Sequence, residues 1–202
     1  VARWVEEEGL SLDVCTGGEL AVAQRVQFPG ERIGFHGNNK SVAEIRTALT
    51  YGVGRLVVDS FQEIERIAAV AAELGVVAPL MVRVTVGVEA HTHEFIATGH
   101  EDQKFGFSLA GGQAFEAATR ILARPDVFDL LGLHSHIGSQ IFDTGGFEMA
   151  AHRLVALHAR IADEHGHHCP EIDLGGGYGI AYTSQHTPLP ASTLAGEMAG
   201  IL

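Results

Sequence analysis

Short apolar runs, rich in β-branched residues, recur along the chain, and each is followed by a segment in which apolar residues repeat at helical spacing. We predict strands at residues 11–16, 32–37, 55–60, 79–86, 128–136 and 170–177. Their nearly continuous apolar character is typical of parallel strands covered on both faces, whereas half-exposed antiparallel strands alternate apolar and polar residues. The pattern therefore predicts an α/β fold.

The segments between these strands carry helix signals. Ser41 with Glu44, and Ser60 with Glu63, have the capping-box spacing that marks the start of a helix. Gly75 is placed to end the second of these helices. Two segments carry an apolar stripe that a helix would turn toward a core, formed by Ile64, Ile67, Ala68 and Ala71 and by Phe147, Ala151, Leu154 and Ile161.

Alternating strands and helices are compatible with a doubly wound open sheet or with a closed barrel. A barrel needs eight strands and typically about 250 residues, whereas this chain of 202 residues has roughly six strand–helix units. The opening segment VARWVEEEGL resembles the end of a helix that stops at Gly9, and the final segment LPASTLAGEMAGIL is helix-like. A barrel would therefore lack about one unit at each end, as in a chain cut from a longer one.

The composition narrows the class of partner. The formal net charge of −12 argues against nucleic acid, which needs a basic surface, and against anionic membrane surfaces. No apolar run approaches the roughly 20 residues that a membrane-spanning helix needs. Cys15 and Cys169 lack metal-type spacing and indicate reduced thiols in a cytosolic protein.

Polar residues and glycines gather where the predicted strands end. In both architectures, ligands bind at the carboxyl ends of the parallel strands. The residues at those ends are Asp13, Cys15, His36, Asn38, Asp59, Arg83, His134, His136 and Gly175 to Gly177. This placement predicts a ligand site at that edge of the sheet.

The segment IDLGGGYGI places three glycines directly after a strand. Successive backbone N–H groups without Cβ atoms can bind an anion such as phosphate, and the N-terminus of a helix close behind would strengthen the site. Two other interpretations remain. Gly175 and Gly177 fit a nicotinamide-binding fingerprint, although Ile180 occupies its third glycine position. A tight turn without any ligand has the same composition.

The segment LHSHIGSQ holds the other concentration of polar groups. His134 and His136 are two apart on the predicted strand, so both would face the interior. Leu131 and Leu133 would face the covering helices. His136 could ligate a metal, as His-x-His does at a strand end in barrel amidohydrolases, or stack its flat ring on an aromatic cofactor. The Ser139 hydroxyl could donate to a phosphate oxygen, and both histidines could instead be satisfied core residues.

A polar, histidine-rich stretch at residues 87–108 interrupts the alternation of strands and helices. Long loops inside compact domains are commonly functional. His91, His93 and Glu94 could bind a metal, but no predicted strand would hold them rigidly. We therefore favour a mobile lid of polar residues.

Together these segments resemble a known family. LDVCTGGEL, FHGNNKS, HTHEF with KFG, LHSHIGSQIFD and IDLGGGYGI occur in the order and at the spacing of the pyridoxal-phosphate decarboxylases of the alanine-racemase-like barrel class. The resemblance covers nearly the whole chain. It implies that residues 1–202 are a partial pyridoxal-phosphate-binding domain, an incomplete (β/α)8 TIM-type barrel without its first and last strands. In the family a C-terminal β domain follows.

The resemblance also implies an activity. Pyridoxal 5'-phosphate is the family's cofactor, and the HTHEF and KFG segments favour the branch that converts meso-2,6-diaminopimelate into L-lysine and carbon dioxide. The substrate would be a small amino acid, and neither nucleic acid nor membrane would be a partner. The family implies a cytoplasmic homodimer with shared active sites.

The residues at the strand ends receive roles by the same resemblance. His136 would stack on one face of the pyridine ring. Ser139 and the backbone of Gly176 and Gly177 would hold the phosphate group.

Other roles follow from the same motifs. Arg83 would lie on the barrel floor near the ring, with Asp13 close to it. The loop that closes over the substrate would carry His91, His93 and Glu94. The resemblance implies no metal ligand.

The sequence departs from the family in its lysines and in two other motifs. Only Lys40 and Lys104 are present, and neither follows the first barrel strand, where the family carries its Schiff-base lysine. The family's Glu-Pro-Gly-Arg motif and its cysteine-containing dimer motif are absent as well. We therefore expect the central part of a longer enzyme, inactive by itself. Two alternatives stay open: a metal-dependent barrel hydrolase that uses His134 and His136, and a non-catalytic cofactor-binding relative.

Overall fold

Strands and helices alternate along the chain, as the apolar pattern predicts. The computed structural model describes residues 1–88 and 104–201. The strands are β1 (Leu12–Val14), β2 (Ile33–Phe35), β3 (Arg55–Val58), β4 (Ala78–Thr85), β5 (Phe107–Ser108), β6 (Phe128–His134) and β7 (Glu171–Asp173). The helices are α1 (Ala2–Glu7), α2 (Gly17–Arg25), the 3-10 turn η1 (Gly30–Arg32), α3 (Val42–Tyr51), α4 (Phe61–Leu74), α5 (Gln113–Leu122), α6 (Gly145–His165) and α7 (Ala191–Ala199).

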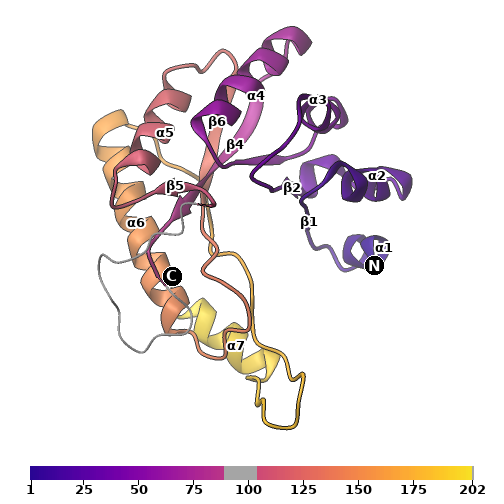
Figure 1. Cartoon of the computed structure of the whole chain (residues 1–202), viewed down its shortest axis with the longest axis vertical. Coiled ribbons are helices and arrows are strands. Elements are labelled where there is room, and N and C mark those ends of the chain that lie inside the picture. Colours follow the sequence, from indigo (N-terminus) through magenta and orange to yellow (C-terminus); the bar gives the residue numbers. More distant parts are fainter. Residues whose placement is uncertain (89–103, 202) are drawn as a thin grey trace.

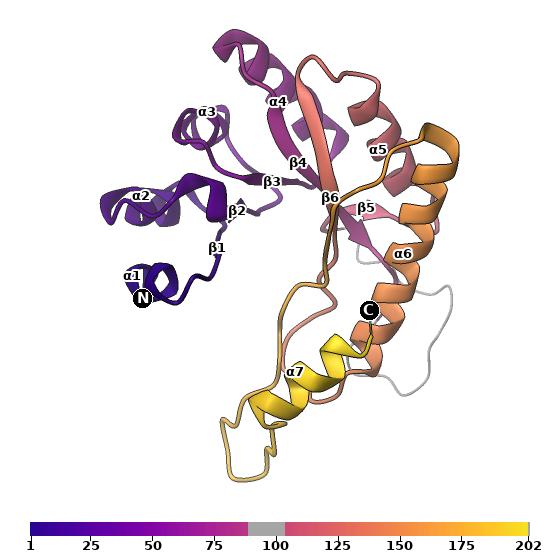
Figure 2. The same cartoon turned by 180° about the vertical axis from the view of Figure 1, so that it is seen from behind.

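The strands form a parallel sheet in the order β1-β2-β3-β4-β6-β7, and the short β5 pairs with β4. Helices α2 to α6 surround the outer face of this sheet, and α7 lies beyond it at the end of an extended segment (Figures 1 and 2). Two side-chain contacts cross the inner face. Arg55 on β3 pairs with Glu171 on β7, and the His36 ring after β2 has its centroid 4.8 Å from that of the His134 ring on β6. Such contacts require a curled sheet, so the barrel architecture is confirmed over a doubly wound sheet.

The predicted helix signals are confirmed by their capping contacts. The Ser41 hydroxyl accepts the Glu44 N–H at 3.2 Å, and the Glu44 carboxylate accepts the Ser41 N–H at 2.9 Å. This reciprocal pair is the capping box. Helix α4 starts after Ser60, whose hydroxyl accepts the Glu63 N–H at 3.3 Å, but the Glu63 carboxylate accepts the Asp59 N–H, so only half of this second capping box forms. The helix ends before Gly75, whose φ of 67° stops it. Both predicted apolar stripes are buried, at Ile64, Ile67, Ala68 and Ala71 on α4 and at Phe147, Ala151, Leu154 and Ile161 on α6.

All six predicted strands end earlier than the sequence predicts, and two of these ends matter for the site. β6 stops at His134 and β7 at Asp173, so His136 and the following glycines lie in loops beyond the sheet. Gly175 lies inside the strand predicted at 170–177 and has a positive φ of 70°, so an extended strand cannot continue through it. The candidate site is therefore built on loops that leave adjacent strands.

Candidate active site

The loop after β6 packs against the three glycines that follow β7. We refer to Gly175–Gly177 as the glycine turn. A Cβ atom added to Gly175 would lie 2.6 Å from the Ser135 carbonyl oxygen, and one added to Gly177 would lie 2.0 Å from the Gly138 carbonyl oxygen. Only glycine permits so close an approach of two backbones. The structure thus brings together the two segments predicted to hold a cofactor.

The glycine turn and the neighbouring loop present hydrogen-bond donors that no protein group uses. In the part of the chain that the structure describes, the N–H groups of Gly176 and Gly177 and the hydroxyl group of Ser139 have no hydrogen-bond partner. A Cβ atom on Gly176 would meet nothing within 4 Å, so the turn is open on this side. Unpaired amide and hydroxyl donors on adjoining segments fit the oxygens of a phosphate group.

A helix N-terminus does not contribute to these donors. After the glycine turn, the next helix is α7, which begins only at Ala191. No helix dipole therefore strengthens the anion site from behind the glycine turn. Binding would depend on the local N–H and O–H groups.

His136 is exposed beside the glycine turn, and its Nδ1 atom would lie 3.1 Å from a Cβ atom added to Gly175. Partial burial lowers the pKa of the His136 imidazole, and the positive charge of Arg83 lowers it further. A neutral imidazole can stack on an aromatic ring without the cost of desolvating a charge. The predicted stacking role therefore fits both the position and the charge of this side chain.

We expect the His136 imidazole to titrate below the ordinary histidine pKa of 6.5. Because its pKa is lower in the folded protein than in the unfolded chain, folding becomes less favourable as the pH falls from about 6.5 through the folded value. Arg83→Met removes a positive neighbour and should raise this pKa. An NMR titration of the imidazole signals, assigned with His136→Gln, measures both effects, and exposed His152 on α6 is the control. A His136 pKa at or above 6.5 would contradict the prediction.

Arg83 lies on β4 at the level of His134 on β6. Its Nη1 atom is 3.6 Å from Asp59 Oδ2, and its guanidinium carbon is 4.5 Å from the centroid of the Phe105 ring. The other oxygen of Asp59 accepts the Gly106 N–H at 2.8 Å. The carboxylate and the aromatic ring thus fix a positive charge inside the curled sheet, where the family resemblance expects the barrel floor.

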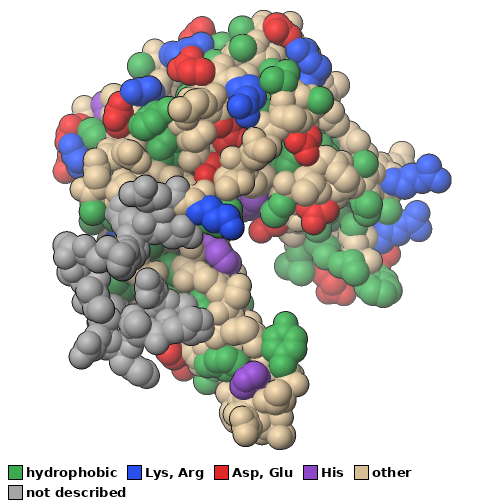
Figure 3. Space-filling model, viewed as in Figure 1, with side chains coloured by type: hydrophobic (Ala, Val, Ile, Leu, Met, Phe, Trp, Pro, Cys, Tyr) green, Lys and Arg blue, Asp and Glu red, His purple; other side chains and the backbone are tan. Residues whose placement is uncertain are grey.

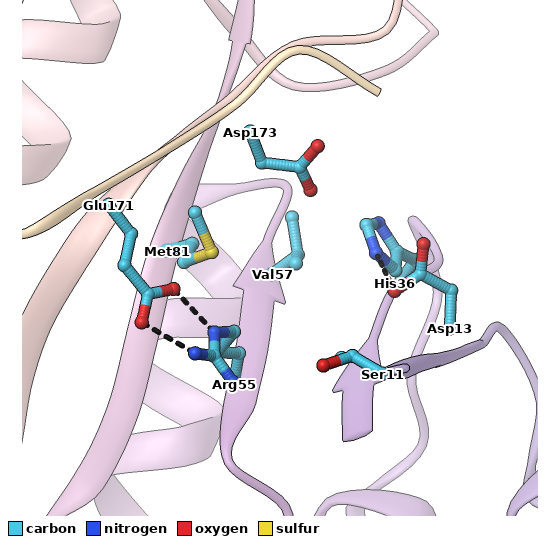
Figure 4. Close-up of a pocket in the computed structure, with 9 residues that line it drawn as sticks. Ser11, Asp13, His36, Arg55, Val57, Met81, Glu171 and Asp173 are labelled. Atoms are coloured by element: carbon cyan, nitrogen blue, oxygen red, sulfur yellow. Dashed lines mark hydrogen bonds and ion pairs between the residues drawn. The ribbon is translucent and has the colours of Figure 1, made fainter. Parts of the chain in front are cut away.

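Four side chains form a row across the concave face of the sheet. His36 Nε2 lies 3.3 Å from Asp13 Oδ1, and His134 Nδ1 lies 2.9 Å from Asp173 Oδ2. The two imidazole rings meet edge to face, at an angle of 72°. Gly34 leaves room for the Asp13 carboxylate, because a Cβ atom there would lie 2.8 Å from Oδ1. Three members of this row (Asp13, His36 and Asp173) line a cavity of about 200 Å³ (Figure 4).

The sequence reasoning missed Asp173, the last residue of β7. Burial raises the pKa of this carboxyl group, but the contact with His134 and the N–H of Gly175 outweigh burial, so its pKa lies below the ordinary value. Asp173 is therefore an anion near neutral pH. The only local signal was its position just before the three glycines, which does not reveal its neighbour on β6.

Lys40, one of the two lysines of the chain, is buried in a pair with Glu63. Its ammonium group donates to the carbonyl oxygens of Gly37 and Val57, both at 2.7 Å, and to the Glu63 carboxylate at 2.9 Å. These contacts account for all three ammonium donors. We predict that Lys40 is not the Schiff-base lysine, and the full set of contacts around its ammonium group supports this prediction.

The metal-dependent hydrolase finds no support. His134 turns toward Asp173 inside the sheet, whereas His136 is exposed beyond the strand end. Among residues 1–88 and 104–201, no group of three or more His, Cys, Asp or Glu side chains could hold a metal ion. The space-filling view shows histidine side chains on the wall of the hollow between the body of the molecule and α7 (Figure 3). The predicted loop residues His91, His93 and Glu94 lie outside the described residues.

Comparisons with known proteins lead to one family. The model of the pyridoxal binding domain of pyridoxal-dependent decarboxylases matches residues 1–202. The chain is 56% identical to a diaminopimelate decarboxylase of Mycobacterium tuberculosis over 209 residues and 53% identical to one of Corynebacterium efficiens over 198 residues. These alignments cover 100% and 98% of this chain but only 46% and 43% of the two relatives. The chain thus spans less than half the length of these relatives.

Solved structures resemble the fold over nearly the whole chain. A diaminopimelate decarboxylase from M. jannaschii in complex with L-lysine has a TM-score of 0.88 at 30% identity, covering 99% of this chain and 46% of that one. The enzyme from Helicobacter pylori complexed with L-lysine has a TM-score of 0.84 at 27% identity, covering 100% of this chain and 50% of that one. Both comparisons agree with the curled parallel sheet.

Proposed function

Since this chain belongs to the family of pyridoxal-dependent decarboxylases, we propose that the full-length protein converts meso-2,6-diaminopimelate into L-lysine and carbon dioxide, with pyridoxal 5'-phosphate as cofactor. The choice of substrate is supported by relatives named diaminopimelate decarboxylases at 53 and 56% identity. The structural observation that carries the proposal is the set of unpaired donors on the glycine turn and Ser139, beside an exposed His136 of lowered pKa. We further propose that residues 1–202 belong to one cofactor-binding barrel domain.

The rim of the site would bind the cofactor from two sides. When bound, pyridoxal phosphate supplies an electron-poor ring that accepts the electron pair left when carbon dioxide departs. The N–H groups of Gly176 and Gly177 and the hydroxyl group of Ser139 would donate to the phosphate oxygens. The neutral ring of His136 would cover one face of the pyridine ring and exclude water from it.

The interior of the curled sheet would supply fixed charges. Arg83, held by Asp59 and Phe105, places a positive charge where negative charge near the ring would be stabilised. Asp13, whose Oδ1 lies 3.3 Å from His36 Nε2, would add a carboxylate near the end of β1. Because Arg83 is already paired with Asp59, its charge needs no reorganisation when a ligand arrives.

Further assignments rest on the family resemblance. The loop residues His91, His93 and Glu94 would contact the substrate. The lysine that binds the cofactor covalently would lie elsewhere in the full-length protein, because neither Lys40 nor Lys104 has the family's position and Lys40 is saturated by its buried contacts.

We expect the full-length protein with pyridoxal phosphate to release equal amounts of L-lysine and carbon dioxide from meso-diaminopimelate. Ser139→Ala should weaken cofactor binding by about tenfold, because one hydrogen bond to a charged phosphate is lost. Ser184→Ala, an exposed serine outside the site, is the matched control. Tight cofactor binding without L-lysine release would contradict the proposed activity and support a non-catalytic relative.

The assembly and the location of the protein are part of the same proposal. We propose a cytoplasmic homodimer with shared active sites, as in the family. In the described residues no helix is long and apolar enough to cross a membrane, and neither cysteine is in a disulfide. Sedimentation of the full-length protein with and without cofactor tests the oligomeric state.

A further inference from the structure

Asp173 ends β7, next to β6 and just before the glycine turn. It is the register partner of His134, and its backbone carbonyl accepts the Ser135 N–H at 2.9 Å. Its side chain lines the cavity on the concave face of the sheet (Figure 4). One carboxylate thus lies within reach of both segments predicted to hold the cofactor.

The two carboxylate oxygens of Asp173 have different partners. Oδ1 accepts the Gly175 N–H at 2.7 Å, and this contact closes the first bend of the glycine turn. Oδ2 lies 2.9 Å from His134 Nδ1, although without the alignment of a hydrogen bond. Removing the carboxylate would therefore release the turn and the histidine together.

His134 is a fixed partner because a second imidazole supports it. The His36 ring contacts the His134 ring from the side of β2, with 4.8 Å between centroids, and Asp13 in turn lies 3.3 Å from His36. His134 is also nearly inaccessible to solvent, with 3% of its surface exposed. Asp173 therefore ties a turn without regular structure to a rigid part of the sheet.

The distances around the glycine turn show why its position matters. A Cβ atom on Gly175 would lie 3.2 Å from His136 Cα, and one on Gly177 would lie 3.3 Å from Ser139 Cα. A small shift of the turn would therefore change the spacing between its free N–H groups and the Ser139 hydroxyl. Binding one phosphate group with donors from two loops requires this spacing to be constant.

We propose that Asp173 is a positioning residue, whose carboxylate holds the glycine turn against the β6 loop so that donors from both segments can bind one phosphate group. The inference rests on the proposed role of the Gly176 and Gly177 amides and the Ser139 hydroxyl. Asp173 acts through the turn and does not itself contact the cofactor.

The test compares two ligands of the apo form of the full-length protein: pyridoxal phosphate and pyridoxal, which lacks the phosphate. Fluorescence titration gives both dissociation constants. Asp173→Ala should weaken pyridoxal phosphate binding at least about tenfold and pyridoxal binding by less than about threefold. Asp173→Asn keeps an oxygen that can accept the Gly175 N–H and should bind pyridoxal phosphate within about threefold of the unaltered protein. A general loss of structure would weaken the binding of pyridoxal phosphate and pyridoxal to the same extent.

Hydrogen exchange supplies a second readout that does not depend on the ligand. The amides of the glycine turn should exchange faster in Asp173→Ala than in the unaltered protein, and not in Asp129→Ala, which removes an exposed carboxylate from β6. The inference would be overturned if Asp173→Ala bound pyridoxal phosphate as tightly as the unaltered protein does, or if it lost affinity equally for pyridoxal phosphate and pyridoxal. If Asp173→Ala does not fold, Asp173→Asn provides the test. A tenfold loss of pyridoxal phosphate affinity in Asp173→Asn would contradict the proposal. Failure of the proposed activity can be distinguished from failure of this inference, because the protein would then bind the cofactor without converting the substrate.

Discussion

Replacing Lys40 with Met should lower the free energy of unfolding by about 3–5 kcal/mol, because it leaves one half of a buried ion pair without its partner. The Lys40 and Glu63 side chains are only 1% and 3% exposed. Burial raises the pKa of Glu63, and Lys40 opposes that rise. Methionine has nearly the shape of lysine but cannot donate to Glu63 or to the carbonyl oxygens of Gly37 and Val57. The expected loss therefore comes from unsatisfied polar groups and not from a cavity.

Urea denaturation of the full-length protein, followed by circular dichroism, measures this loss. Arg46→Met is the matched control, since it removes a cation from the Arg46–Glu73 pair, whose side chains are 42% and 60% exposed. It should cost less than about 1 kcal/mol. Adding Glu63→Gln to Lys40→Met should recover part of the stability, because the amide can still accept the Asp59 N–H without a buried charge. Equal effects of Lys40→Met and Arg46→Met would refute the prediction.

Gly177→Ala should reduce the affinity for pyridoxal phosphate by about a hundredfold or more and destabilise the fold by roughly 2–4 kcal/mol. The new methyl group would lie 2.0 Å from the Gly138 carbonyl oxygen, and the backbone φ of 104° is strained for alanine. The two backbones must separate, which moves the turn away from the loop that carries Ser139. Isothermal titration with pyridoxal phosphate and thermal unfolding measure the two losses.

Gly176→Ala, one residue before Gly177, should affect ligand binding without affecting the stability of the fold. A Cβ atom there would meet no atom within 4 Å, so stability should stay within about 0.5 kcal/mol of the unaltered protein. The methyl group enters the open side of the turn, where the phosphate would bind, and should lower cofactor affinity. Gly196→Ala, in the exposed helix α7, is the control for glycine replacement as such. Unchanged cofactor affinity in Gly176→Ala would place the phosphate elsewhere.

Local sequence patterns were sufficient for most of the secondary structure. The capping box at Ser41 and Glu44, and the stripe on α4, depend on contacts between residues a few positions apart, which a sequence displays directly. Strand ends were less well predicted. The positive φ angle of Gly175 keeps β7 from reaching its predicted end at residue 177, and a glycine in a sequence does not reveal whether its flexibility is used.

The candidate site was only partly visible in the sequence. His136, Ser139 and the glycine turn stand out because their types are unusual at the end of an apolar strand, and the structure brings them together. Asp173 could not be assigned, because one aspartate on a strand has no distinctive pattern until its neighbour on β6 is known. Its importance depends on strand order and register, which are long-range properties.

By itself, the sequence determined the alternation of strands and helices, the acidic charge and the motifs that mark a pyridoxal-dependent decarboxylase, because these depend on residue type and on spacing along the chain. Only the tertiary structure decided that the sheet curls, so that His36 from β2 meets His134 from β6, and that Lys40 is enclosed by Glu63. The physical reason is that curvature and the pairing of buried charges arise from contacts between residues far apart in the chain, whose partners no local pattern names.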